Sequence, residues 1–179
     1  MRNQRPAPEL DPDANPASVA RDIILRQLTL APKSRHQLAQ KLAERHVPED
    51  VAEAVLDRFE EIKLIDDAEF AQLWVRSRQQ HKSLARGALK RELAEKGISG
   101  EFAEEALAQV SDEDEAEAAG ELVRRKIRPS MNLGERAERE KYTRRWVAML
   151  ARKGYNPSAA FATVGTVIDD FLDGLDDQD

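Results

Sequence analysis

Apolar residues recur every three or four positions along most of this 179-residue chain, a spacing typical of helices that bury one face. The first stripe runs from Ala17 to Leu28, and Pro32 then ends the predicted helix. Ser34 is expected to start the next helix, because Gln37 stands three residues later and completes a capping box. No stretch alternates with period two for long enough to predict a strand. The pattern therefore predicts a chain built of helices.

The same spacing predicts further helices at residues 48–63, 67–80, 84–96, about 102–107, 116–128, 136–153 and 157–172. Pro48 is expected at the first position of its helix, and Asp66 is expected to cap the helix that follows it. The side chains expected to be buried are Leu38, Leu42, Val51, Val55, Phe59, Ile62, Phe70, Leu73, Trp74, Leu89, Leu93, Phe102, Ala106, Leu107 and Trp146.

A short motif occurs three times, as LAERHVPEDV from Leu42, LAEKGISGEF from Leu93 and LARKGYNPSA from Leu150. Four positions after the leucine stands a turn residue, which is His46, Gly97 or Gly154. Glycine ends a helix readily because it adopts the left-handed conformation without steric penalty. Each copy therefore predicts two helices joined by a tight turn.

Nine helices in three groups predict an all-α fold of three tandem three-helix modules, each resembling a helix-turn-helix. The modules are expected at residues 17–65, 66–111 and 112–172. A proline-rich leader at residues 1–16 is expected to be disordered, and residues 173–179 form an acidic tail. A period near fifty residues favours a protein that binds something long over an enzyme with one pocket.

Composition narrows the class of protein. The chain has no cysteine, which excludes disulfides and thiolate metal sites. It has neither an apolar signal segment near the N-terminus nor a stretch approaching the roughly 20 apolar residues of a membrane span. We therefore expect a cytoplasmic protein without membrane contact.

Charge is segregated along the chain, so the formal net charge of −6 is a poor guide to the surface. Six aspartates lie in the last eleven residues, and the segment SDEDEAE from Ser111 carries five acids. By contrast, residues 121–153 hold eleven Lys or Arg against four Glu, a balance of +7. Residues 75–96 hold seven against two, a balance of +5.

These two basic stretches supply the candidate binding residues. The first set is Arg76, Arg78, Lys82, Arg86, Lys90 and Arg91, and the second is Arg124, Arg125, Lys126 and Arg128 with Arg144 and Arg145. Either set could contact phosphates or an acidic protein surface. The alternative is an ordinary solvated helix surface, with ion pairs from the first set to Glu92 and Glu95.

No pattern of residues predicts catalysis, a metal site or a cofactor. Asp66, Asp67 and Glu69 are explained more simply by helix capping and the helix dipole. The three histidines have no ligand spacing to one another or to the acids. A phosphate-cradling glycine-rich loop is also missing, so the chain is not expected to bind ATP.

The string KLIDDAEFAQLWVRSR from Lys63, followed by ALKRELAEKGIS from Ala88, resembles the central signature of the RecX family of RecA regulators. The flanking strings LRQLTLAPKSRHQLAQKL and WVAMLARKGYNP resemble that family's outer repeats, so the similarity runs from Ala20 to Ile168. One departure is His46, where the family favours glycine. A left-handed histidine costs about 1 kcal/mol against glycine, so this turn is expected to be looser or differently capped.

The resemblance implies an elongated, curved helical array of three-helix modules without catalytic activity of its own. Such proteins bind the groove of the RecA nucleoprotein filament, inhibit its ATPase, strand-exchange and coprotease activities, and limit filament growth. DNA contact would be weak, independent of sequence and made through phosphates, and the chain is expected to be a monomer. Two alternatives stay open: a sequence-independent DNA-binding protein that acts without RecA, and an adaptor that binds only proteins.

Overall fold

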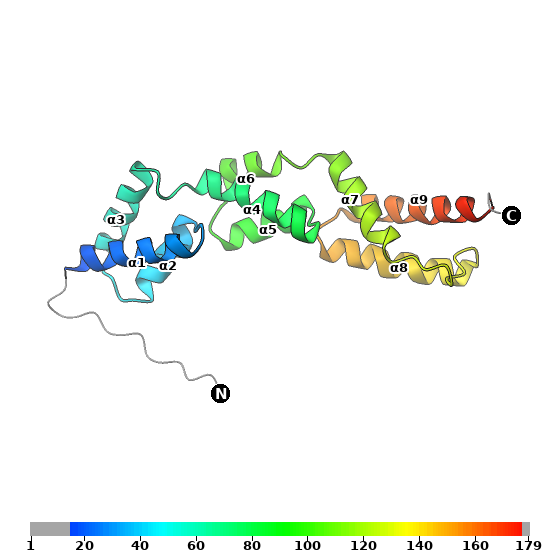
Figure 1. The fold of residues 1–179 in the computed structure, drawn as a ribbon, viewed down its shortest axis with the longest axis horizontal. Coiled ribbons are helices and arrows are strands. Elements are labelled where there is room, and N and C mark those ends of the chain that lie inside the picture. The colour runs from blue at the N-terminus through cyan, green and yellow to red at the C-terminus, as the bar shows by residue number, and fades with distance from the viewer. Residues whose placement is uncertain (1–14, 177–179) are drawn as a thin grey trace, which may run out of the picture. The chain divides into compact units, whose positions relative to one another are not determined.

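The computed structural model describes residues 15–176, which form nine helices and no strand (Figure 1). The prediction of an all-α fold is therefore confirmed for this part of the chain. The helices are α1 (Pro16–Leu30), α2 (Arg35–Ala43), α3 (Glu49–Glu61), α4 (Asp67–Lys82), α5 (Arg86–Glu95), α6 (Gly100–Leu107), α7 (Asp112–Arg124), α8 (Arg136–Arg152) and α9 (Pro157–Asp176). The elongated, curved arrangement of the array stays a prediction.

The chain divides into two compact units, and the division passes through the middle module. The first unit extends to Gln72 and includes Leu93–Ala103, and the second holds Leu73–Glu92 and the residues from Glu104 onward. In the first unit, α1, α2 and α3 enclose a core formed by Ala20, Ile24, Leu38, Leu42, Val47, Ala52, Val55, Leu56, Phe59 and Ile65. Each unit thus has its own buried residues.

The three predicted turns share one hydrogen-bonding pattern. The backbone N–H donates to the leucine carbonyl five residues earlier at Val47 (3.1 Å), Ile98 (2.9 Å) and Tyr155 (3.2 Å). The turn residue before each of these is left-handed, with φ of 57° at His46, 76° at Gly97 and 90° at Gly154. These bonds satisfy carbonyls that a helix end would leave unpaired. The turn at His46 is therefore capped like the others, and the expectation of different capping was wrong.

Close packing explains why two of these turns need glycine. A Cβ at Gly97 would lie 2.3 Å from the Cβ of His36, and one at Gly154 would lie 2.2 Å from the backbone nitrogen of Ala88. No real Cβ tolerates such a distance, so both positions require glycine for space as well as for φ. His46 is exposed, so its position requires a positive φ but not the absence of a Cβ.

The close approaches belong to two equivalent junctions, one in each unit. In the first, the Ser34 hydroxyl donates to the Lys96 carbonyl at 2.7 Å. In the second, the Ala85 N–H donates to the Lys153 carbonyl at 3.0 Å. Each junction joins the start of one helix, α2 or α5, to the turn that ends a later one, α5 or α8. The repeat thus extends from the turns to the contacts that the turns make.

An acid from the following module also caps each of these helix starts. The Arg35 N–H donates to Asp67 at 2.8 Å, and the Arg86 N–H donates to Glu115 at 2.5 Å. Carboxylates are favourable there because the first helical N–H groups lack partners within the helix.

Some sequence-based placements were wrong. Three residues expected inside are exposed: Ile62 (47%), Leu73 (40%) and Phe102 (47%). The buried positions nearby belong instead to Leu56, Ala71, Val75 and Ala103, so the buried stripe is rotated on each helix. Trp74, also expected to be buried, is only half-buried. Pro48 is the N-cap of α3 and not its first helical residue.

Other placements are confirmed. Ser34 and Gln37 form the predicted capping box. The Glu69 N–H donates to Asp66 at 3.0 Å, which lowers the pKa of that carboxyl and establishes the predicted cap.

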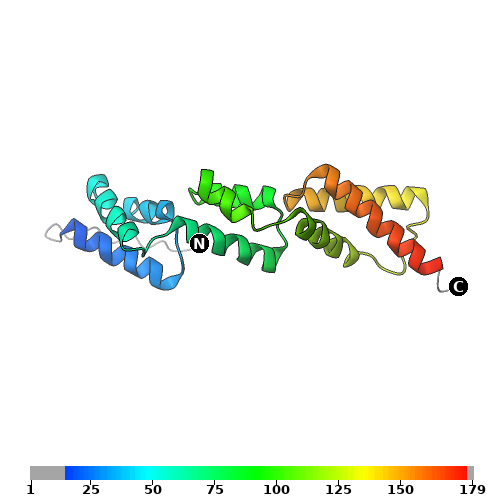
Figure 2. The same ribbon diagram turned by 90° about the horizontal axis from the view of Figure 1, so that it is seen from above.

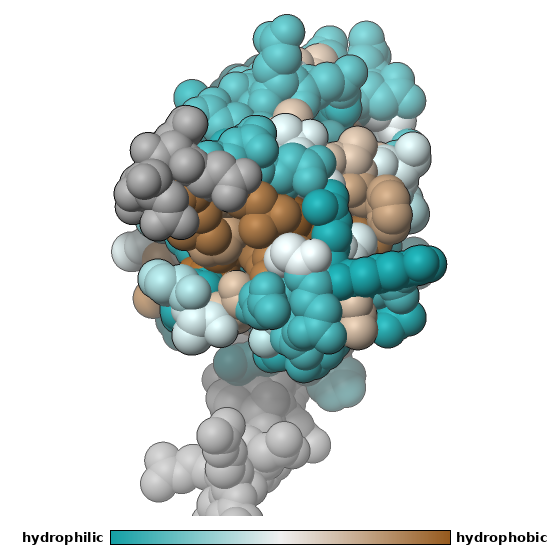
Figure 3. All heavy atoms as spheres, turned by 90° about the vertical axis from the view of Figure 1, so that its right-hand side faces the viewer, coloured by the Kyte–Doolittle hydropathy of each residue, from teal (hydrophilic) through white to brown (hydrophobic). Residues whose placement is uncertain are grey.

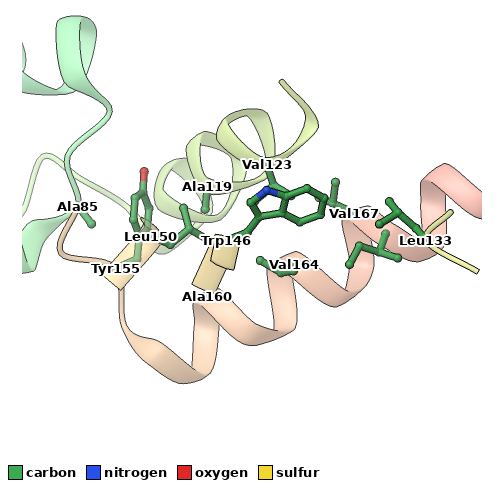
Figure 4. Packing of buried hydrophobic residues seen from close by; sticks show 11 residues of the cluster. Ala85, Ala119, Val123, Leu133, Trp146, Leu150, Tyr155, Ala160, Val164 and Val167 are labelled. Atoms are coloured by element: carbon green, nitrogen blue, oxygen red, sulfur yellow. The ribbon is translucent and has the colours of Figure 1, made fainter. Parts of the chain in front are cut away.

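In the second unit, α7, α8 and α9 pack together, and α8 and α9 lie side by side in both Figures 1 and 2. Trp146 of α8, only 3% exposed, lies in this core with Val123 of α7 and Val164 and Val167 of α9 (Figure 4). This confirms the prediction that Trp146 is a core residue. The core fixes which face of α8 is left for other contacts.

Two helix ends differ from the prediction in this unit. Helix α7 begins at Asp112 and not near residue 116, because Ser111 and Asp114 form a capping box and four acids fill the first turn. Helix α9 continues to Asp176, four residues into the predicted acidic tail. Of the predicted leader, residues 1–14 lie outside the described residues, as do residues 177–179 of the tail.

Candidate functional site

A groove of about 420 Å³ lies between α8 and the segment that follows α7. We call it the third-module groove. Its lining residues are Lys126, Arg128, Met131, Tyr142, Arg145, Trp146, Met149 and Arg152. Four are cations and none is an acid. The groove therefore favours an anionic ligand.

The sequence builds one wall of this groove by helical spacing. Residues 142, 145, 146, 149 and 152 recur every three or four positions, so they share one face of α8. The other wall is a turn, in which the Met131 N–H donates to the Arg128 carbonyl at 3.0 Å. The Arg128 side chain also donates to the carbonyls of Arg125 (3.0 Å) and Ile127 (3.2 Å), which holds the segment in place.

The base of the groove is aromatic and apolar. The rings of Tyr142 and Trp146 stack with their centroids 5.3 Å apart and their planes inclined by 28°. The Lys141 ammonium lies over the Tyr142 ring, 5.1 Å from its centroid. Glu138 accepts a hydrogen bond from this ammonium at 2.8 Å, which raises the pKa of Lys141. Met131 and Met149 are half-buried beside these rings.

Three predicted residues, Lys126, Arg128 and Arg145, meet at this groove, and Lys126 and Arg145 are exposed. Lys126, Arg145 and Arg152 form no ion pair with another residue of the described chain. Their charge is therefore available to a ligand. Arg152, Tyr142 and the two methionines were not predicted as site residues. The spacing along α8 could have identified Tyr142, Met149 and Arg152, because it places them on the same helix face as Arg145, whereas Met131 lies in the turn before α8.

Arg144 lies apart from Arg145, although the two are neighbours in sequence. It lines a second groove of about 430 Å³ with Arg136, Arg139, Glu140, Thr143 and Phe161. One residue corresponds to about 100° of rotation around a helix, so adjacent side chains point to different sides. In this second groove Arg139 is paired with Asp169 at 2.7 Å, and Phe161 is 63% exposed.

Arg124 and Arg125 are both near one acid of their own helix region. Arg124 pairs with Glu121 at 2.5 Å, and Arg125 lies 3.9 Å from the same carboxylate. Both arginines are exposed, so these contacts contribute little to stability. Among the six third-module candidates, only Lys126, Arg128 and Arg145 line the third-module groove.

The second-module candidates include two arginines with structural contacts. The Arg78 Nε donates to Glu92 at 2.8 Å, and its guanidinium lies 4.1 Å from the centroid of the Trp74 ring. The Trp74 indole donates to the same Glu92 oxygen at 2.9 Å. The ion pair to Glu92 that the sequence offered as an alternative is therefore present for Arg78.

Arg86 is held by two acids of α7. Its guanidinium bonds to Asp112 and, at 3.2 Å, to Glu115. These hydrogen bonds raise the pKa of the guanidinium. Glu115 also accepts the Arg86 backbone N–H, so the residue is part of the second junction. Its role is to join α5 to α7.

The other second-module candidates are Arg76, Lys82, Lys90 and Arg91. Their side chains are exposed and form no ion pair within residues 15–176. The Lys82 carbonyl accepts a hydrogen bond from Lys153 at 2.6 Å. These four remain candidates for weak contacts at a surface.

Across the described helices and turns, no group of three or more His, Asp or Glu side chains could hold a metal ion. None of the described helices is both long and apolar enough to cross a membrane.

Comparison with known proteins gives the class. Residues 20–59 match the family model described as the first three-helix domain of RecX, and residues 66–107 match its second three-helix domain. The fold is similar to a crystal structure of RecX from Lactobacillus salivarius, with TM-score 0.70 and 21% identity over 87% of this chain and 96% of that one. The class is thus one of helical proteins built from three-helix domains.

Relatives in sequence give the family. The chain is 44% identical to the "Regulatory protein RecX" of Streptomyces coelicolor, over 89% of this chain and 83% of that protein. It is 41% identical to the protein of the same name from Mycolicibacterium vanbaalenii, over 87% and 86%. The chain belongs to the RecX family, as the sequence motifs predicted.

Proposed function

We propose that this chain is a negative regulator of RecA that binds in the groove of the RecA–DNA filament. In this role it inhibits ATP hydrolysis, strand exchange and coprotease activity, and it limits filament growth. Membership in the RecX family supports the proposal most strongly, because the relatives named as regulatory proteins align over most of the chain. We expect it to act in the cytoplasm, as a monomer and without a cofactor.

The repeated construction supports a long partner. Three copies of one turn, and two equivalent junctions, recur along the sequence. Proteins built in this way commonly use an extended surface on a partner. A filament offers such a surface because its subunits also repeat.

We assign filament contact first to the unpaired cations of the third-module groove, which are Lys126, Arg145 and Arg152 with Arg128 beside them. The exposed bases Arg76, Lys82, Lys90 and Arg91 would add weaker electrostatic contacts. Arg78 and Arg86 are assigned to structure, because acids of the same unit already hold them.

The alternative is a sequence-independent DNA-binding protein that acts without RecA. The four cations of the groove favour this alternative, because such charges also suit phosphates. The two functions differ in what they require of bare DNA. A regulator of the filament needs only weak affinity for it, whereas a DNA-binding protein needs tight binding.

Binding to three targets separates these functions. Fluorescence anisotropy would compare RecA filaments on labelled single-stranded DNA, the same DNA alone, and RecA alone. We expect binding to filaments to be at least about tenfold tighter than binding to bare DNA. Only the binding to bare DNA should lose most of its affinity as the salt concentration rises. Equal affinity for bare DNA and filaments would support the alternative, and no binding to any target would contradict both.

A further inference from the structure

We propose that the third-module groove binds an acidic peptide segment of a partner protein, anchored by a large apolar side chain. The inference rests on the proposed function, which assigns partner contact to this groove, and deepens it by stating the chemistry of the segment that binds there. Three features of the groove support this proposal: the positive charge of its lining, its apolar base, and the burial and stacking of its aromatic rings.

The charge of the groove selects an anion. Its lining includes four cations and no carboxylate. Lys126, Arg145 and Arg152 have no ion-pair partner in the described part of the chain, so a ligand would not have to displace an acid. Arg128 is turned toward backbone carbonyls but keeps further N–H donors on its guanidinium.

The base of the groove selects an apolar group. Met131 and Met149 are half-buried there, beside Tyr142 and Trp146. Methionine is flexible and adapts its shape to apolar side chains of different kinds. A volume of about 420 Å³ is enough for one or two large side chains and lies in the lower range of ligand pockets.

The rings argue against a nucleic acid as the ligand. Proteins that bind single strands stack bases on exposed aromatic faces. Here Trp146 is 3% exposed, and Tyr142 already stacks on Trp146 and lies under the Lys141 ammonium. Without a stacking platform, the apolar base of the groove would gain little from a sugar–phosphate chain. Carboxylates at the rim with an apolar anchor below satisfy both parts of the lining.

The chain carries its own reporters for this site. It has three methionines: Met131 and Met149 line the groove, and Met1 lies outside the described residues. Methionine methyl groups labelled with ¹³C would give one NMR signal each in the full-length protein. The signals of Met131 and Met149 therefore report on the groove.

The first probe is a short synthetic peptide that alternates glutamate with phenylalanine and leucine. In one matched peptide glutamine replaces the glutamates, and in a second serine replaces the apolar residues. The third matched probe is an oligothymidylate. We expect the first peptide to shift the Met131 and Met149 signals. Each matched peptide should bind at least about tenfold more weakly, because it lacks either the carboxylates or the apolar side chains.

Two neighbouring substitutions provide the structural control. Arg145→Glu and Arg144→Glu change the net charge equally, but only Arg145 lines the third-module groove. We expect Arg145→Glu to weaken the peptide about tenfold and Arg144→Glu to leave its binding unchanged. Thermal unfolding of both variants would confirm that each is folded.

The proposal would be overturned by any of three results. The methionine signals could stay in place with the peptide, the oligothymidylate could shift them as strongly, or both substitutions could have the same effect. Since the titration contains no RecA, inhibition of RecA together with silent methionines would reject this inference and leave the proposed function intact.

Discussion

The basic residues of the second and third modules look alike in sequence and differ in structure. In the second module, Arg78 and Arg86 are held by Glu92, Asp112 and Glu115. In the third, Arg145 and Arg152 border a groove without an acid in its lining. The difference teaches that a basic stretch becomes a binding surface only where the fold brings no carboxylate to it.

The acids that neutralise Arg86 come from the acidic segment that begins at Ser111. That segment starts α7, where its carboxylates also suit the helix dipole. It therefore meets the start of α5 and leaves the groove beside α8 unaffected. The position of this acidic segment thus neutralises Arg86 in the second module and leaves the cations of the third-module groove without an acid beside them.

Apolar side chains also reach the surface of the third module. Seen from the end where α9 stops, apolar side chains gather at the surface and are surrounded by hydrophilic ones (Figure 3). Leu175, 46% exposed, lies in the last turns of α9. Combined charge and apolar surface is typical of sites that bind other proteins.

The largest expected effect is on filament binding. Arg145→Glu with Arg152→Glu should weaken binding to RecA filaments about 100-fold, roughly 2.7 kcal/mol, because two cations of the groove become acids. The matched pair Lys90→Glu with Arg91→Glu makes the same change of net charge in the second module and should weaken binding about threefold. Anisotropy with filaments on labelled single-stranded DNA measures both. Equal losses from the two pairs would mean that total charge, and not the groove, governs binding.

The second effect is on stability. Arg86→Ala should lower the free energy of unfolding by about 2 kcal/mol, because it removes the guanidinium that Asp112 and Glu115 hold at the junction. Lys90→Ala, one turn further along α5, should change it by less than about 0.5 kcal/mol. Urea unfolding followed by circular dichroism measures both. If the two variants unfold alike, Arg86 has no structural role beyond that of an exposed base.

A smaller effect concerns Tyr155, which is buried near Glu115 and whose hydroxyl donates to the Ser83 carbonyl at 3.0 Å. Burial, with the nearby Glu115 carboxylate, raises the pKa of Tyr155 to about 12. An unfolded tyrosine titrates near pH 10, so this group's stabilisation is fully present below about pH 10 and is lost as the pH rises through 12. Tyr155→Phe should lower stability by about 1 kcal/mol at neutral pH.

The pH dependence tests that assignment. The stability difference between the native chain and Tyr155→Phe should close as the pH rises from 10 to 12, since phenylalanine does not titrate. Urea unfolding at several pH values measures it. A difference that stays constant over this range would show that the tyrosine contributes by packing alone.

The smallest effect is expected at Arg78. Arg78→Ala should lower stability by about 0.5 to 1 kcal/mol, because the Trp74 ring loses the guanidinium that covers it. The indole hydrogen bond to Glu92 would remain. Arg76→Ala is the control, and Trp fluorescence during unfolding measures both. A larger loss from Arg76→Ala would reverse the assignment of these two residues.

Much of the fold could be predicted because local rules determine it. The turns at His46, Gly97 and Gly154 formed as the repeated motif indicated, since their chemistry involves residues close in sequence. The buried faces were harder to predict. Ile62 and Leu73 lie one step from the buried stripe, and a period of 3.6 does not distinguish two neighbouring stripes when both contain apolar residues.

The site was predicted less completely than the fold. The sequence identified Lys126 and Arg145 as members of a basic stretch, but grouped Arg144 with them although it lies in another groove. It also could not show that Arg86 would meet Glu115, which is 29 residues away. Pairing over such distances depends on how helices pack, which charge counts along the sequence do not contain.

The most direct test of the regulatory role is ATP hydrolysis by RecA on single-stranded DNA, with this protein added below equimolar ratio. A regulator that limits filament growth should inhibit hydrolysis at substoichiometric amounts, because one molecule affects many RecA subunits. Unchanged hydrolysis in the presence of the folded, helical protein would contradict the proposed function.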